Sequence, residues 1–99
     1  MISPLTDSER SEALAKLSHW TYDEGRKALH RQLKLANFSQ ALGLMVRIGM
    51  EAEKADHHPE WFNVYNRIDI WLTTHDAGGV SRRDIALAQV IDAMAAEQS

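Results

Sequence analysis

Two short segments of the chain hold most of the side chains that could perform chemistry. The first covers residues 53–61 and carries the adjacent histidines His57 and His58, and the second is the run Thr-Thr-His-Asp at residues 73–76. An unperturbed imidazole has a pKa of ~6.5, so near neutral pH it can either donate or accept a proton. If the two segments meet in the fold, three imidazoles converge and can perform acid/base chemistry.

Aromatic residues near these segments could wall such a site. A slot with aromatic sides and a few oriented polar groups suits a flat heterocyclic ligand, which stacks on the rings and forms hydrogen bonds at its edge. The sequence offers three candidate walls, which are Trp61, Tyr65 and the more distant Trp20.

Other interpretations of the same residues stay open. His57 and His58 could be ordinary polar residues at a helix C-terminus, where a cation complements the helix dipole. A metal site is a weaker alternative, because adjacent histidines rarely converge on one ion and no two histidines stand four residues apart. Asp84 is most simply a helix-capping residue, although it could also point inward.

The composition excludes several classes of function. The chain of 99 residues contains no Cys, which excludes disulfides, zinc–thiolate sites, iron–sulfur clusters and thiol nucleophiles. Its 11 basic and 14 acidic residues give a net charge of -3, so we expect no nucleic-acid partner. The sequence also lacks an apolar run suited to a membrane span or to a secretory signal, and we expect a cytoplasmic protein without a membrane partner.

The hydrophobic pattern predicts the elements that must position these residues. Capping-box spacing marks the start of a helix over about residues 7–17. Two short antiparallel strands should follow, joined by a turn at Gly25, and Arg31 is out of step with their alternating pattern. A helix over about 38–55 comes next, with a predicted core-facing stripe of Phe38, Ala41, Leu42, Met45, Val46, Gly49 and Ala52.

The second half of the chain repeats the strand pair and ends in another helix. Strands are predicted at 61–64 and 67–74, and the closing helix begins with the capping pair Ser81 and Asp84. The element order is therefore αββαββα. Its simplest packing is a four-stranded antiparallel sheet with helices packed on one face, which makes residues 1–99 a single α+β domain.

A tryptophan on the outward side of the last predicted strand suggests a covered surface. Trp71 and Thr73 share the face of the sheet that the helices should leave bare. A homo-oligomer with two-fold symmetry, either a dimer or a tetramer, could cover this face and protect the sheet edges. The equal alternative is that neighbours in the same chain half-bury Trp71.

The residues that could perform chemistry stand at fixed intervals, in the order Glu53, His57, His58, Pro59, Tyr65, His75 and Asp84. The segments that separate the last four of them are five, nine and eight residues long. This pattern, together with the block at residues 53–66, resembles the signature of the pterin-4a-carbinolamine dehydratase family. The similarity extends from the Trp20 region to residues 81–85.

The resemblance implies a reaction and a set of functional residues. Members of this family convert 4a-hydroxytetrahydrobiopterin to quinonoid dihydropterin and water, without a metal or organic cofactor, and so recycle the pterin for an aromatic amino-acid hydroxylase. The resemblance implies catalytic roles for His57, His58 and His75, with His57 and His75 as the proton-transfer pair. The substrate-binding residues that it implies are Glu53, Asp56, Pro59, Trp20, Thr73, Thr74 and Asp76, and Asp84 would support the strand-to-helix corner.

A different class of function also follows from the resemblance. Some animal members of the family act as dimerisation cofactors of a transcription factor, through the surface that they use for self-assembly. The alternative expectation is therefore a non-enzymatic interaction module of the coactivator type. The presence of all three histidines favours the enzyme, because a pure scaffold would need none of them.

Overall fold

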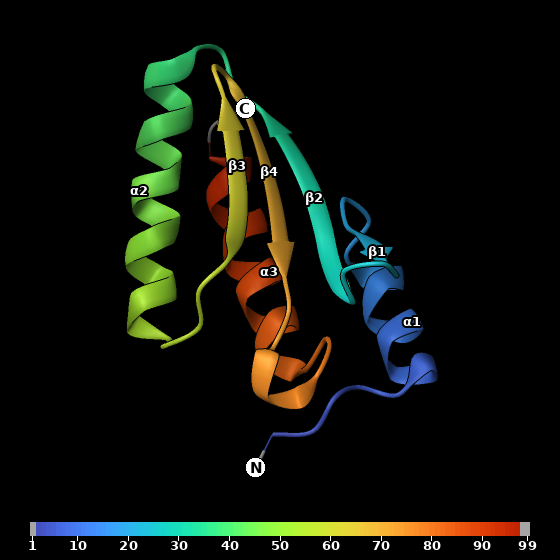
Figure 1. The fold of residues 1–99 in the computed structure, drawn as a ribbon. Coiled ribbons are helices and arrows are strands. Elements are labelled where there is room, and N and C mark those ends of the chain that lie inside the picture. Colours follow the sequence, from blue (N-terminus) through green and yellow to red (C-terminus); the bar gives the residue numbers. More distant parts are fainter. Residues whose placement is uncertain (1, 98–99) are drawn as a thin grey trace.

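The elements of the fold follow the order that the sequence predicts. The structure, a computed structural model, describes residues 2–97, and residues 1 and 98–99 of the predicted domain lie outside this part. The strands form one antiparallel sheet in the order β1-β2-β4-β3, which confirms the predicted α+β class (Figure 1). The elements are α1 (Asp7–Lys16), β1 (Thr21–Asp23), β2 (Ala28–Lys34), α2 (Phe38–Lys54), β3 (Glu60–Val64), β4 (Arg67–Leu72), the short 3-10 helix η1 (His75–Ala77) and α3 (Arg82–Ala96).

Side-chain caps start the helices where the spacing predicts. Thr6 and Glu9 form a reciprocal capping box at α1, and Ser81 and Asp84 form another at α3. Asn37 caps α2 by accepting a hydrogen bond of 2.9 Å from the backbone of the third residue of that helix. These bonds satisfy amide groups that have no partner within their own helix. In the described part of the chain, no helix has both the length and the hydropathy that a bilayer crossing requires.

One face of the sheet packs against α2 and α3 and forms the core. Arg31, which breaks the apolar alternation of β2, lies on this inner face, where it forms an ion pair with Asp92 of α3. Asp92 also accepts a hydrogen bond of 2.8 Å from the indole nitrogen of Trp20. The buried apolar side chains that β2 and β4 contribute to this core are Leu29, Leu33, Ile68, Ile70 and Leu72.

The buried side of α2 differs from the predicted stripe. Ala41, Leu44, Ile48 and Ala52 are the residues of this helix that are buried. The predicted stripe was wrong for three members, because Phe38, Leu42 and Val46 are 46%, 46% and 55% exposed. The helix is apolar over a wider arc than the sheet can cover, so periodicity alone does not show which part meets the sheet. We call the exposed residues Phe38, Leu42, Val46 and Met50 the α2 row.

Neighbours in the same chain cover Trp71 on the outer face of the sheet. Its ring stacks on the imidazole of His30, with the ring centroids 4.7 Å apart. The guanidinium carbon of Arg26 lies 3.9 Å from the ring centroid of Trp71, and the indole N–H donates to Asp23 over 3.1 Å. These contacts correspond to the alternative in which the chain itself half-buries Trp71. Trp71 therefore does not require a second subunit to cover it.

Candidate active site

The two chemistry-bearing segments meet in the fold, which fulfils the condition for three converging imidazoles. Residues 56–58 follow α2, residues 73–76 follow β4, and both border one cavity of about 280 Å³. All three predicted histidines line it. The full set of lining residues is Asp56, His57, His58, Glu60, Thr73, Thr74, His75, Asp76 and Arg83.

The end of α2 turns the two adjacent histidines in different directions. The backbone N–H of Asp56 donates to the carbonyl of Glu53 over 3.1 Å, and that of His57 donates to Ala52 over 3.0 Å. This pair of bonds is the Schellman arrangement, which requires a left-handed residue after the helix, and Asp56 supplies it with a φ of 52°. Glycine usually holds this position. The chain reverses there, so His57 is buried while His58 stays exposed.

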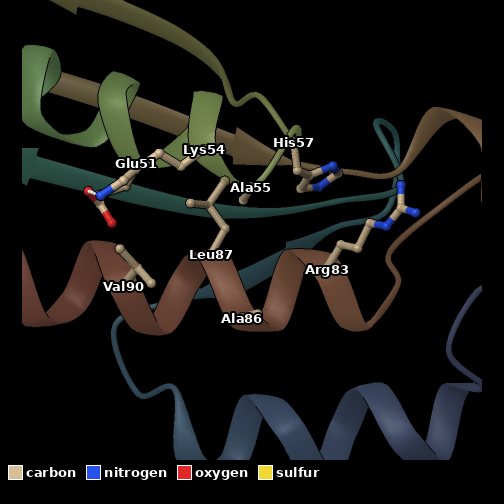
Figure 2. A pocket seen from close by; sticks show the side chains of 8 residues that line it. All are labelled: Glu51, Lys54, Ala55, His57, Arg83, Ala86, Leu87 and Val90. Carbon is tan, nitrogen blue, oxygen red and sulfur yellow. Dashed lines mark hydrogen bonds and ion pairs between the residues drawn. The ribbon is translucent and has the colours of Figure 1, made fainter.

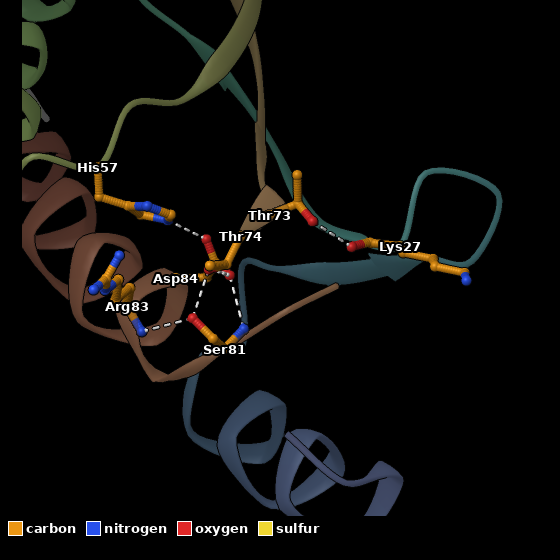
Figure 3. Close-up of polar contacts among 7 residues, drawn as sticks. All are labelled: Lys27, His57, Thr73, Thr74, Ser81, Arg83 and Asp84. Atoms are coloured by element: carbon orange, nitrogen blue, oxygen red, sulfur yellow. Dashed lines mark hydrogen bonds and ion pairs between the residues drawn. The ribbon is translucent and has the colours of Figure 1, made fainter. Parts of the chain in front are cut away.

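A buried carboxylate holds His57. Its Nε2 atom lies 2.5 Å from Oδ1 of Asp84, whose side chain is completely buried at the start of α3 (Figure 3). The second oxygen of Asp84 accepts 2.8 Å hydrogen bonds from the hydroxyl of Thr74 and from the backbone N–H of Ser81. A buried charge is tolerated only when its hydrogen bonds are satisfied. Here the carboxylate has three donors, and Asp84 is both the predicted helix cap and the partner of a histidine.

The hydroxyl groups beside Asp84 form a chain with one consistent direction. The hydroxyl of Thr74 donates to Asp84, so the 2.5 Å contact between Thr74 and Ser81 has Ser81 as its donor. The oxygen of Ser81 in turn accepts the backbone N–H of Arg83 over 3.2 Å. The single hydrogen of the Thr74 hydroxyl is thereby used. Thr74 lines the cavity as predicted, but its side chain supports Asp84 and has no free hydrogen to offer a ligand.

The other two histidines lie in more open surroundings. His58 pairs through Nε2 with Glu53 over 2.7 Å, and both side chains are largely exposed. Glu53 therefore contacts the site through His58 and does not line the cavity itself. His75 begins η1 and is exposed. The chain returns after η1 through Gly78, whose φ of 71° allows Thr74 to pair with Gly79.

None of the three residues of the predicted aromatic wall lines the cavity in this chain. Trp20 is only 3% exposed and belongs to the hydrophobic core, where its indole nitrogen is bound to Asp92. Trp61 lies on the inner side of β3 and packs against the core. Tyr65 is 61% exposed in the turn between β3 and β4. Pro59 is half-buried and also lies outside the lining residues.

Two residues that the sequence reasoning did not select also line the cavity, namely Glu60 and Arg83. Glu60 opens β3 and pairs across the sheet with Trp71, so strand alternation could have placed it on the outer face. Arg83 precedes Asp84 in the first turn of α3. Neither position is linked to the cavity by a local pattern, because each residue reaches it only through the packing of its element.

A second cavity of about 370 Å³ adjoins the first between α2 and α3 (Figure 2). The two cavities share His57 and Arg83 as lining residues. The second cavity is mainly apolar, with charged groups at its rim. Its remaining lining residues are Glu51, Lys54, Ala55, Ala86, Leu87 and Val90.

The polar groups of the site are arranged in pairs that suit proton transfer. His57 is joined to Asp84 and His58 to Glu53, while the side chain of His75, in the opposite segment, has no hydrogen-bond partner among residues 2–97. A histidine that is oriented by a carboxylate is a common general acid or base. Among residues 2–97, no cluster of three or more potential ligands is placed to hold a metal ion.

Comparison with known proteins finds relatives along almost the whole chain. The family model described as pterin 4 alpha carbinolamine dehydratase matches residues 3–94. A Rhizorhabdus wittichii protein provisionally named pterin-4-alpha-carbinolamine dehydratase is 56% identical over 94 residues, covering 95% of this chain and 97% of that protein. A Burkholderia ambifaria protein with the same name is 56% identical over 92 residues, covering 93% and 90%. The crystal structure of a Brucella melitensis protein described as a transcriptional coactivator/pterin dehydratase matches with a TM-score of 0.91 and 47% identity, covering 94% of this chain and 99% of that one.

Proposed function

The chain belongs to the family of pterin 4 alpha carbinolamine dehydratases, and from this premise we propose that it converts 4a-hydroxytetrahydrobiopterin to quinonoid dihydropterin and water. One observation carries the proposal. Three histidines border a single cavity, and one of them is held by a completely buried carboxylate. This arrangement suits a reaction that consists of two proton transfers.

The reaction requires an acid on one atom of the pterin and a base on another. The bond between C4a and the hydroxyl oxygen breaks, and the oxygen takes a proton from the acid and leaves as water. The base removes the proton of N5, and the electron pair of the N5–H bond forms the new double bond between N5 and C4a. Each positioned proton-transfer group typically contributes ~10²–10⁴-fold to the rate.

The contacts of His57 support its assignment as the base. An ionised carboxylate can only accept, so Nε2 of His57 donates to Asp84, and the neutral ring then carries its lone pair on Nδ1. We propose that this Nδ1 atom removes the proton from N5 of the pterin. His75, exposed on η1 across the same cavity, then protonates the departing hydroxyl. His58 binds the pterin, and Glu53 orients His58.

The remaining polar residues of the cavity would bind the edge of the pterin ring. Asp56 and Asp76 are exposed carboxylates that can accept the ring N–H groups. The hydroxyl of Thr73 donates to the carbonyl of Lys27 over 2.8 Å, which leaves its oxygen as an acceptor (Figure 3). The reaction places the protein in tetrahydropterin recycling. We propose that it acts in the cytoplasm beside an aromatic amino-acid hydroxylase.

The direct test of this function is a dehydration assay with freshly generated carbinolamine, followed by absorbance. We expect the pure protein to accelerate dehydration without added metal, and a chelator to leave the rate unchanged, because the proposed chemistry uses only side-chain acids and bases. A protein without activity on the carbinolamine would contradict the proposal. Activity that a chelator removes and a divalent ion restores would contradict the acid/base mechanism.

A second candidate function, that of an interaction module, is favoured by one observation. The α2 row places four large apolar side chains on the surface at intervals of one helical turn, between 46% and 63% exposed. A contiguous apolar patch on the surface can mark a protein contact. We propose that a second copy of this chain covers the row, because a two-fold contact sets the same row against itself and closes without further growth.

A charge in the α2 row should weaken this self-association. We expect the unmodified protein to be a dimer or tetramer by light scattering, and Val46→Glu to shift it toward monomer, because the contact would bury an unpaired carboxylate. Gln40→Glu is the matched control, since it adds the same charge at an exposed position outside the row. A monomeric unmodified protein at micromolar concentration would refute the oligomer.

A further inference from the structure

An arginine from a distant turn holds one carboxylate of the cavity. Arg26 lies in the turn between β1 and β2, and its Nη2 atom donates to Oε1 of Glu60 over 3.1 Å. Glu60 opens β3 on the far side of the sheet and lines the cavity that carries the three histidines. The ion pair therefore crosses the outer face of the sheet and ends at the candidate active site.

Two further contacts hold Arg26 in this position, and a third joins the two residues that make them. Its guanidinium carbon lies 3.9 Å from the ring centroid of Trp71, in the geometry of a cation–π contact. Its backbone N–H donates to Oδ1 of Asp23 over 3.1 Å, and Oδ2 of Asp23 accepts the indole N–H of Trp71 over 3.1 Å. We call Asp23, Arg26 and Trp71 the clamp. It fixes both ends of a side chain that would otherwise be flexible.

The turn that carries Arg26 is also tied to the cavity by its backbone. The carbonyl of Lys27 accepts the hydroxyl of Thr73, which is another lining residue (Figure 3). Lys27 holds a left-handed conformation with a φ of 51°. Such a conformation in a residue other than glycine persists only where its surroundings hold it in place. The turn and the cavity therefore form one connected unit.

Glu60 differs from the other carboxylates of the cavity in being restrained. In the described part of the chain, Asp56 and Asp76 have no cationic partner, whereas Glu60 has Arg26. A side chain that is already ordered loses less conformational freedom when it binds a ligand. A carboxylate also has about four lone-pair positions, so the single bond from Arg26 leaves others available. Among the carboxylates that line the cavity, Glu60 should therefore lose the least conformational freedom when it binds a ligand.

We infer that Glu60 is a substrate-binding residue and that the clamp positions it. This inference rests on the proposed function. A pterin presents two adjacent donors at the end of its pyrimidine ring, the N3–H and the 2-amino group, and a carboxylate can accept both side by side. Glu60 takes this edge, which leaves C4a and N5 at the opposite end of the ring system for the histidines. The recognised chemistry is the 2-amino-4-oxopyrimidine group.

Equilibrium binding of 7,8-dihydrobiopterin, which is not dehydrated, tests this assignment. We expect Glu60→Gln to raise the Kd about 10-fold or more. The reason is that the NH2 group of the new amide would face the N3–H or the 2-amino group of the pterin, which are also donors. Arg26→Ala should raise the Kd by a similar factor, and the double variant should be no weaker than Glu60→Gln alone. In the dehydration assay, Arg26→Ala should raise KM far more than it changes kcat.

Arg10→Ala is the matched control for the clamp. Arg10 also stacks on an aromatic ring, with its guanidinium carbon 3.7 Å from the centroid of Tyr22, and pairs with Asp7. It lies outside the cavity and should leave both Kd and KM unchanged. The ion pair of Arg26 and Glu60 is about half exposed, and an exposed ion pair contributes little to stability, so Arg26→Ala should not lower the melting temperature much.

Three outcomes would overturn the inference. If an active enzyme with Glu60→Gln binds dihydrobiopterin as tightly as the unmodified protein, Glu60 does not bind the substrate. If Arg26→Ala leaves the Kd unchanged while Glu60→Gln raises it, the clamp has no positioning role. If the unmodified protein neither binds the pterin nor dehydrates the carbinolamine, the proposed function fails as well, and the loss of activity distinguishes this case from the first two.

Discussion

Alanine at His57 or at His75 is expected to lower kcat by roughly 10²-fold or more while the fold stays intact. The reason is that each substitution removes one of the two groups assigned to proton transfer, and such groups typically contribute ~10²–10⁴-fold. His75 is exposed, so its removal should also leave the melting temperature unchanged. His58→Ala should act mainly on KM, because His58 is assigned to hold the pterin. Steady-state kinetics of the dehydration measure both parameters.

His19→Ala is the matched control for these variants. His19 is exposed in the segment between α1 and β1 and lies outside the cavity, so its loss should leave kcat and KM unchanged. Circular dichroism of each variant checks that the fold is retained. If His57→Ala and His75→Ala both keep near-normal kcat, the assignment of the proton-transfer pair is wrong even though the family is established.

Asparagine at Asp84 should damage both catalysis and stability. An amide replaces one carboxylate oxygen with an NH2 group, which carries two N–H donors and must face either the Nε2–H of His57 or the donors from Thr74 and Ser81. The wrong tautomer of His57 is then favoured, and we expect kcat to fall by about 10²-fold or more. The unpaired donor should lower the free energy of unfolding by about 1–3 kcal/mol.

Ser81→Ala separates the two effects of Asp84→Asn. It removes a hydroxyl from the network and the cap of α3, at a cost of about 1 kcal/mol in stability. The bond between His57 and Asp84 remains, so kcat should fall by much less than in Asp84→Asn. Thermal unfolding and kinetics, both measured well below the melting temperatures, test this. Equal losses of kcat in the two variants would mean that Asp84 acts only through stability.

The element order and the identity of the histidines could be predicted from the sequence because both depend on local information. Alternation along β4 and the 3.6-residue period of α2 follow from the geometry of a single strand or helix. The capping box of Ser81 and Asp84 is likewise set within one turn of α3. The spacing of the histidines relative to these elements placed residues 56–58 and 73–76 at two ends that could meet.

The positions of the aromatic residues could not be predicted from local sequence. Trp20, Trp61 and Tyr65 are of the right type for a ligand wall, but the fold uses Trp20 and Trp61 in the core and leaves Tyr65 exposed. The stripe of α2 was misplaced for a related reason. A helix that is apolar over a wide arc can meet a sheet in more than one rotation, and only the packing of Leu44 and Ile48 against the sheet selects one.

The sequence by itself determined the elements, their order and the residue types available for proton transfer, because these follow from periodicity and side-chain chemistry. Only the tertiary structure decided which of those residues act together. His57 and Asp84 are 27 positions apart, and Arg26 and Glu60 are 34 apart. No local pattern relates such pairs, since their distance depends on how a helix end, a turn and a strand end pack on one sheet. That packing made a helix cap the partner of a histidine and brought Glu60 to the cavity.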